Sequence, residues 1–167
     1  MFKLKPLSRT AIPSALAKAE RYRLLNEPGE AESICRDVLQ LDPAHQEALV
    51  MLVLALSDQF PGHSGAKAAA AARDALTQVL DEYARLYYGG IVHERRAKAE
   101  LALGRPGSNA GVHQGLRAAM SCYERAEALR PEGNDDVILR WNACARLAME
   151  LPATEPDIPD ARAVQNE

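Results

Sequence analysis

Aromatic residues are scarce in this chain, and no long hydrophobic segment runs through it. Phe, Trp and Tyr make up 5% of the 167 residues, and β-branched residues are few, which disfavours a sheet-rich fold. The longest apolar run extends from Ala48 to Leu56, whereas a membrane-spanning helix needs about 20 apolar residues. The basic start, Met1 to Pro6, is not followed by the apolar stretch of a secretory signal. These absences argue against a membrane or secreted protein.

The chain also has only three cysteines and no excess of positive charge. Cys35, Cys122 and Cys144 lie far apart and form no C-x-x-C motif, and each has apolar neighbours at helical spacing. We therefore expect small core residues of a reduced, cytoplasmic protein. The chain has 20 Lys and Arg against 23 Asp and Glu, a net charge of −3, so it lacks the basic excess of a nucleic-acid-binding domain.

Alanine and leucine, in contrast, are abundant, and 47% of the residues are hydrophobic, which favours a helical domain with a real core. The apolar spacing predicts seven helices and no sheet. We expect them from about Pro13 past Tyr22, over 31–41, over 44–59, from 66 into the Tyr83 region, and over 87–103, 112–130 and 135–151. The run from Ala48 fits a buried strand or a buried helix by periodicity, and its Leu, Met and Ala content favours helix.

Proline and glycine mark the boundaries between these predicted helices. Asp42 and Pro43 are expected to open the third helix as N-cap and first residue, and Asn134 to cap the last one. Gly89-Gly90 would weaken the first turn of the fifth helix, so either that helix starts later or another backbone approaches closely there. The expected organisation is a basic extension over 1–11, a helical domain over 12–151, and an acidic tail over 152–167, in which three prolines exclude a helix.

One spacing pattern recurs along the chain. Ala31, Cys35, Val38 and Pro43 are spaced like Ala119, Tyr123, Ala126 and Pro131, and a third copy, Ala72, Leu76 and Val79, has Ala84 where the proline would fall. The pattern resembles the second helix of a tetratricopeptide repeat. The copies lie farther apart than the family period of about 34 residues, and the excess falls in the two Gly/Pro loops near 61–65 and 105–111.

This resemblance implies an all-α fold, a tetratricopeptide-like right-handed superhelix of three helix pairs plus a closing helix. It implies a non-catalytic adaptor that binds a protein or peptide segment in a concave groove, with no cofactor. Carried over by register, the groove positions are Leu16, Glu20, Arg23, Glu47, Val50, Leu54, Ser57, Tyr88, Ile91, Arg95, Lys98, Ile138, Asn142 and Arg146. The centre of that set is apolar, and its end is basic, so an acidic group is expected near Arg95, Asn142 and Arg146.

Two departures and two rival interpretations accompany the resemblance. Family members that grip chaperone C-termini use lysine and asparagine where this chain has Leu16 and Glu20, which makes that function improbable here. The first rival is a secretion-type chaperone that shields an apolar export substrate. The second is a homo-oligomeric structural part, possible as a homodimer through the closing helix, where Ile138, Leu139 and Met149 extend beyond the core stripe.

No catalytic or metal-binding pattern is found in the sequence. His45, His63, His93 and His113 are scattered and form no H-x3-H or H-E-x-x-H motif. The glycines from Gly104 to Gly111 lack the lysine of a phosphate-binding loop, and the charge run at 94–98 is expected to be a solvated helix face. We therefore expect neither an enzyme, nor a metal site, nor a nucleic-acid or membrane partner.

Overall fold

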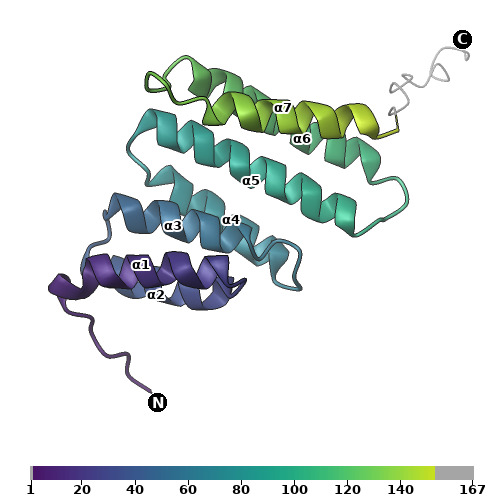
Figure 1. The fold of residues 1–167 in the computed structure, drawn as a ribbon. Coiled ribbons are helices and arrows are strands. Elements are labelled where there is room, and N and C mark those ends of the chain that lie inside the picture. Colours follow the sequence, from purple (N-terminus) through teal and green to yellow (C-terminus); the bar gives the residue numbers. More distant parts are fainter. Residues whose placement is uncertain (1, 153–167) are drawn as a thin grey trace, which may run out of the picture.

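The computed structural model describes residues 2–152. All regular secondary structure in that range is helical, and it contains no β-strand. A short 3-10 turn precedes the α-helices of this part of the chain (Figure 1). The elements are η1 Arg9–Ala11, α1 Ile12–Leu24, α2 Pro28–Leu41, α3 Gln46–Ser57, α4 Gly65–Thr77, α5 Glu82–Ala102, α6 Asn109–Glu127 and α7 Asp136–Glu150. The predicted all-α class and the seven helices are confirmed. Of the predicted tail, 152–167, all but Pro152 lies outside the described residues.

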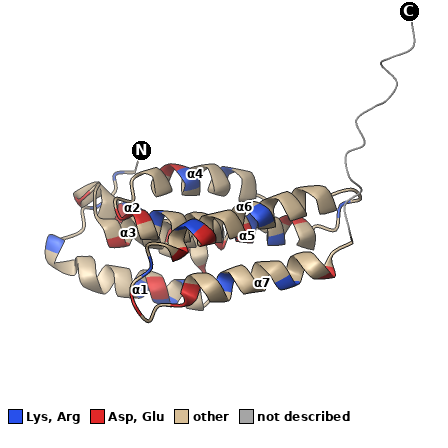
Figure 2. Cartoon of the chain, turned by 90° about the horizontal axis from the view of Figure 1, so that it is seen from above, with Lys and Arg blue, Asp and Glu red and all other residues tan. Residues whose placement is uncertain are grey.

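The helices are stacked along one direction, each packed against its neighbours in sequence (Figure 1). In addition, α1 contacts α3, and α3 contacts α5. Viewed from above, α1 and α7 lie on one side of the molecule and α4 on the opposite side (Figure 2). The row formed by α1, α3, α5 and α7 is therefore bent, with its two ends displaced away from α4. None of the described helices is both long enough and apolar enough to span a bilayer.

The start of α3 differs from its prediction because a histidine supplies the cap. The helix begins at Gln46, and the Nδ1 atom of His45 accepts the backbone N–H of Ala48 at 3.3 Å. Asp42 instead accepts the N–H of Ala44, also at 3.3 Å, within the preceding turn. The expectation that Asp42 and Pro43 open this helix is wrong. In contrast, Pro13 lies in the first turn of α1 as predicted.

The boundary between α4 and α5 was placed too late by several residues. The fourth helix ends at Thr77, not near Tyr83, and α5 begins at Glu82 rather than at 87. The cause is Asp81, whose Oδ1 atom accepts the N–H of Ala84 at 2.7 Å and so satisfies a free donor of the first turn. Gly89 and Gly90 consequently lie in the middle of α5, not near its start.

The last two helices also have shifted ends. The sixth begins at Asn109, inside the segment expected to be a loop, and ends at Glu127 instead of 130. The preceding turn contains Gly104 and Gly107 at φ +57° and +80°, a backbone region that favours glycine. The seventh helix starts at Asp136 with Asp135 as its N-cap, so the prediction that Asn134 caps it is off by one residue. The side-chain oxygen of Asn134 instead accepts the N–H of Asp136 at 3.0 Å from the preceding turn.

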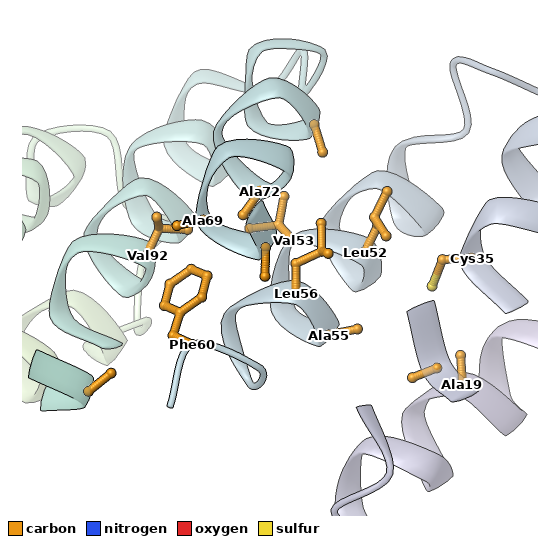
Figure 3. Close-up of a cluster of buried hydrophobic side chains, with 14 residues drawn as sticks. Ala19, Cys35, Leu52, Val53, Ala55, Leu56, Phe60, Ala69, Ala72 and Val92 are labelled. Carbon is orange, nitrogen blue, oxygen red and sulfur yellow. The ribbon is translucent and has the colours of Figure 1, made fainter. Parts of the chain in front are cut away.

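Small side chains allow the helices of this stack to approach closely. Around the α3–α4–α5 contact, Val53, Leu56 and Phe60 lie beside alanines of α4, and Leu52 lies on the side of Cys35 of α2 (Figure 3). A second cluster centres on Tyr123 of α6, which is 1% exposed. Cys35 and Cys144 are fully buried, and burial raises the pKa of each thiol to about 12. Both therefore stay protonated, as expected of core residues.

Gly90 is needed because an aromatic ring occupies the space of its missing side chain. A Cβ atom at this position would lie 2.3 Å from Cε1 of Tyr123, whereas at Gly89 it would meet only Cδ2 of Leu76 at 3.4 Å. The close approach at the glycine pair thus comes from the Tyr123 side chain of α6, not from another backbone. Neither of the two alternatives offered by the sequence, a later helix start or a close backbone, is correct.

We expect Gly90→Ala to lower the free energy of unfolding by about 1–3 kcal/mol, because the new methyl group overpacks the core against Tyr123. Gly89→Ala is the matched control. It meets an ordinary van der Waals distance and gains up to about 1 kcal/mol of helix propensity, so it should be neutral or stabilising. Urea unfolding followed by circular dichroism measures both. Equal effects of the two substitutions would contradict the packing of Tyr123 on Gly90.

Candidate functional site on the face of α1, α3, α5 and α7

The predicted groove positions all lie on the four odd-numbered helices, but their exposure varies. Leu16, Ser57 and Ile91 are buried, with 2%, 1% and 2% exposure, so they belong to the core and offer no binding surface. The half-buried positions are Arg23, Val50, Leu54, Tyr88, Arg95, Ile138 and Asn142. The exposed positions are Glu20, Glu47, Lys98 and Arg146. The surface available to a partner is therefore smaller than the full predicted set.

Asp58, directly after α3, holds together two arginines from different helices. Its Oδ2 atom accepts Nε of Arg23 in α1 at 2.7 Å, and Oδ1 lies 2.5 Å from Nη1 of Arg95 in α5. Arg95 also donates to the Ser57 hydroxyl at 2.6 Å and to the Leu54 carbonyl at 3.2 Å. This group, the Asp58 network, joins α1, α3 and α5. Asp58 was not among the predicted site residues.

Glu94 is the centre of a second network, which joins α5, α6 and α7. Its side chain is 2% exposed, and it accepts the Tyr123 hydroxyl of α6 at 2.7 Å and Nζ of Lys98 at 2.6 Å. Nη1 of Arg140 in α7 lies 3.3 Å from both carboxylate oxygens. The interpretation of the 94–98 charge run as a solvated face is therefore wrong for Glu94. We call these residues the Glu94 network.

The surroundings of Glu94 favour its charged form. Burial acts to raise the pKa of this carboxyl group, but the hydrogen bonds from Lys98 and Tyr123, with the charge of Arg140, outweigh it and hold the pKa below the ordinary 4.5. Burial raises the pKa of the Tyr123 hydroxyl most, and the Glu94 carboxylate raises it further. Tyr123 accordingly remains a hydrogen-bond donor to an ionised Glu94 at neutral pH.

A small hollow of about 250 Å³ opens beside the two networks, between the ends of α3 and α5. It is lined by Ser57, Asp58, Pro61, Arg95, Lys98, Ala99 and Ala102. Three predicted groove residues, Ser57, Arg95 and Lys98, are thus brought together. Asn142 and Arg146 of α7 do not line it, and Arg95 already binds Asp58. That an acidic group of a partner lies near Arg95, Asn142 and Arg146 stays a prediction.

An aromatic group on the first half of α5 adjoins this face. Tyr83 and Tyr87 are stacked with ring centroids 5.9 Å apart, and Tyr87 meets Tyr88 edge-on at 5.1 Å. Tyr87 also lies 6.1 Å from Tyr123, centroid to centroid, next to the Glu94 network. Only Tyr88 is among the predicted positions. The sequence signal for the others is their i, i+4 spacing on α5, which becomes visible only once the helix is known to start at Glu82.

Within residues 2–152, no three His, Cys, Asp or Glu side chains are grouped so that they could hold a metal ion. The histidines have separate surroundings: His45 caps α3, and the Nε2 atom of His113 lies 3.1 Å from the carbonyl oxygen of Pro152.

Comparison with protein-family models, with curated proteins and with solved structures finds no match for this chain.

We expect Glu94→Gln to lower the free energy of unfolding at pH 7 by about 1.5–3 kcal/mol, the usual contribution of hydrogen bonds to a charged group. Because the pKa of Glu94 is lowered in the folded state, its contribution is present above pH 4.5 and is lost as the pH falls through the lowered value. The difference between the variant and the parent chain should therefore shrink below pH 4.5, as measured by urea unfolding at several pH values.

Glu132→Gln is the matched control, since Glu132 is exposed in the turn before α7 and makes no ion pair or side-chain hydrogen bond with another described residue. It should leave the free energy of unfolding unchanged. A Glu94→Gln effect that stays constant down to pH 3 would show that the charge of Glu94 contributes nothing.

Proposed function

We propose that this chain is a non-catalytic adaptor that binds a segment of another protein on the face of α1, α3, α5 and α7. We further propose a tetratricopeptide-type right-handed superhelix, with the pairs α1–α2, α3–α4 and α5–α6 and with α7 as closing helix. The repeat alanines support it: Ala31, Ala72 and Ala119 lie on α2, α4 and α6, and each is 0% exposed. A close crossing of the two helices of a repeat requires such a small buried residue.

The charge balance of this face carries the functional proposal. Two carboxylates, Asp58 and Glu94, form ion pairs with four cationic side chains. The cations of these pairs therefore outnumber the carboxylates beside the small hollow. The cations are Arg23, Arg95, Lys98 and Arg140. A guanidinium that shares its carboxylate retains N–H donors for a further acceptor. An acidic group of a partner fits this end of the face.

Apolar side chains provide the second part of the proposed recognition. Val50 and Leu54 of α3 and Ile138 of α7 are half-buried on the domain itself and keep part of their surface open. The partner we propose is therefore a segment with apolar side chains next to an acidic residue. Apolar burial sets most of its affinity, and the cations set its orientation, because exposed charges are screened by salt while buried area is not.

Peptide libraries displayed on phage and selected on the purified protein test this proposal. Enriched peptides should combine apolar residues with a nearby Asp or Glu. Val50→Asp should weaken their binding at least tenfold, and Arg146→Glu should weaken it several-fold in low salt and less at high salt. Arg95→Glu is unsuitable, because it would place a second carboxylate against Asp58 and disturb the fold.

Arg125→Glu is the matched control, since Arg125 is exposed on α6, away from the proposed binding face. It changes the net charge as Arg146→Glu does and should leave peptide binding unchanged. If selected peptides bind all three variants equally, the face of the odd-numbered helices is not the binding site.

Formation of a homodimer through α7 is a second candidate function, because this helix carries two large apolar side chains that are exposed to solvent. Leu139 is 65% and Met149 81% exposed, whereas Ile138 packs partly on the core. Sedimentation velocity of the parent chain and of the Leu139→Asp, Met149→Asp variant distinguishes the two functions. A dimer that the double substitution dissociates would favour a structural role for α7.

A further inference from the structure

A larger hollow, of about 690 Å³, lies on the other flank of α5, between α4, α5 and the two loops after α3 and α5. Its lining consists of Phe60, Pro61, Gly62, His63, Gly65, Ala66, Ala69, Arg73, Arg96, Ala99, Glu100, Leu103 and Arg105. It shares only Pro61 and Ala99 with the small hollow. We call it the basic hollow. Its volume falls within the range of ordinary ligand sites, so it can hold a chain segment.

Three arginines from separate parts of the chain line the basic hollow. Arg73 comes from α4, Arg96 from α5 and Arg105 from the turn before α6. None of the three is in an ion pair or side-chain hydrogen bond with another residue of the 2–152 range. In contrast, Arg23, Arg95 and Arg140 of the other flank are all paired. The basic hollow thus holds positive charge that the domain does not neutralise.

The single acidic side chain of the lining is turned toward α6. A Cβ atom built on Gly111, in the first turn of α6, would lie 2.8 Å from Oε1 of Glu100. The carboxylate of Glu100 therefore lies against the α6 backbone, and it forms no salt bridge with Arg96 or Arg105. Leu103, which is 55% exposed, adds an apolar surface to the same hollow, whereas Phe60 is 7% exposed and belongs to the core.

The last described residues place the start of the C-terminal segment near this hollow. The carbonyl oxygen of Pro152 lies 3.1 Å from Nε2 of His113, one turn after the start of α6 and close to the turn that carries Arg105. The end of α7, the α5–α6 turn and the α3–α4 turn all lie at the same edge of the molecule (Figure 1). Because an extended residue spans about 3.3–3.6 Å, residues 153–167 can reach on the order of 50 Å.

The sequence of that segment complements the basic hollow. It carries the acidic residues Glu155, Asp157, Asp160 and Glu167 against one basic residue, Arg162. The acidic residues alternate with prolines around Ile158, an apolar side chain that can pack on Leu103 of the hollow. Carboxylates accept paired hydrogen bonds from guanidinium groups, so the charges match in sign and in geometry.

We propose that the basic hollow is the docking site of residues 153–167 of the same chain. Docking neutralises Arg73, Arg96 and Arg105, covers Leu103, and keeps other anionic segments out of the hollow. Attachment through Pro152 gives the segment an effective concentration in the millimolar range, which favours it over a free acidic peptide of equal affinity. The proposal is independent of the binding face of the odd-numbered helices.

A photo-cross-linking amino acid in place of Ile158 tests this docking in the full chain. Irradiation at low salt should give cross-links within one chain to residues around Phe60, Arg73 or Arg96, identified by mass spectrometry. Arg73→Glu with Arg96→Glu should reduce their yield at least fivefold, and so should Asp157→Lys with Asp160→Lys. The tail change leaves every residue of the helical domain unaltered, and circular dichroism checks that the domain stays folded. Combining both pairs of reversals should restore the cross-links.

Arg117→Glu with Arg125→Glu is the matched control, because both arginines are exposed on α6 and neither lines the basic hollow. Its cross-link yield should equal that of the parent chain. Cross-links between two chains, cross-links confined to other elements, or a yield unaffected by the Arg73 and Arg96 reversals would each overturn the proposal. So would a tightly bound small anion found in the purified protein by native mass spectrometry.

Discussion

Burying a carboxylate costs several kcal/mol unless nearby charges and hydrogen bonds compensate, and the packing of α5, α6 and α7 is arranged around that requirement at Glu94. The Tyr123 hydroxyl reaches Glu94 at 2.7 Å only because its ring lies over Gly90, one helical turn earlier, where any side chain would collide with it. Arg140 then draws α7 to the same carboxylate. Glycine, tyrosine and glutamate therefore depend on one another, although they come from two helices.

Asp58 links the helices of the first half of the domain in the same way, by pairing with Arg23 and Arg95, but it is less buried than Glu94. Its side chain is 22% exposed, against 2% for Glu94, so water and salt screen the Asp58 network more strongly. The two networks meet on α5, where the neighbouring residues Glu94 and Arg95 point to different partners. This explains why the longest helix of the described chain lies at the centre of the stack: it is bound on one side to α1 and α3 and on the other to α6 and α7.

The fold class and the helices could be predicted because apolar periodicity is a local property of the sequence. The predicted helix starts were less accurate where an uncommon or overlooked N-cap residue determines the first turn. The ring of His45 and the carboxylate of Asp81 are such caps. Gly89-Gly90 was recognised as a close approach, but the approaching group, Tyr123, lies on another helix. No local pattern could have identified it.

The candidate site was harder to predict, for a different physical reason. Register places residues on a helix face but does not tell which of them the domain uses for its own pairing. Leu16, Ser57 and Ile91 have the right positions yet are buried, and Arg95 has its charge bound to Asp58. Asp58 and Glu94 could not be identified, because all their partners except Lys98 are 29 or more residues away in sequence.

The two flanks of α5 consequently present different kinds of positive charge. On the face of the odd-numbered helices Arg23, Arg95, Lys98 and Arg140 are already held by a carboxylate. An acidic group that enters between the two networks therefore has to share Arg95 or Arg140 with Asp58 or Glu94. Such sharing requires little movement, because the guanidinium groups are already oriented. At the basic hollow the arginines are not held by any described carboxylate, so an anion there supplies neutralisation that the domain lacks. We therefore expect the first surface to select a partner by fit, and the docking of residues 153–167 at the second to be driven by charge, with a steeper dependence on salt at the second.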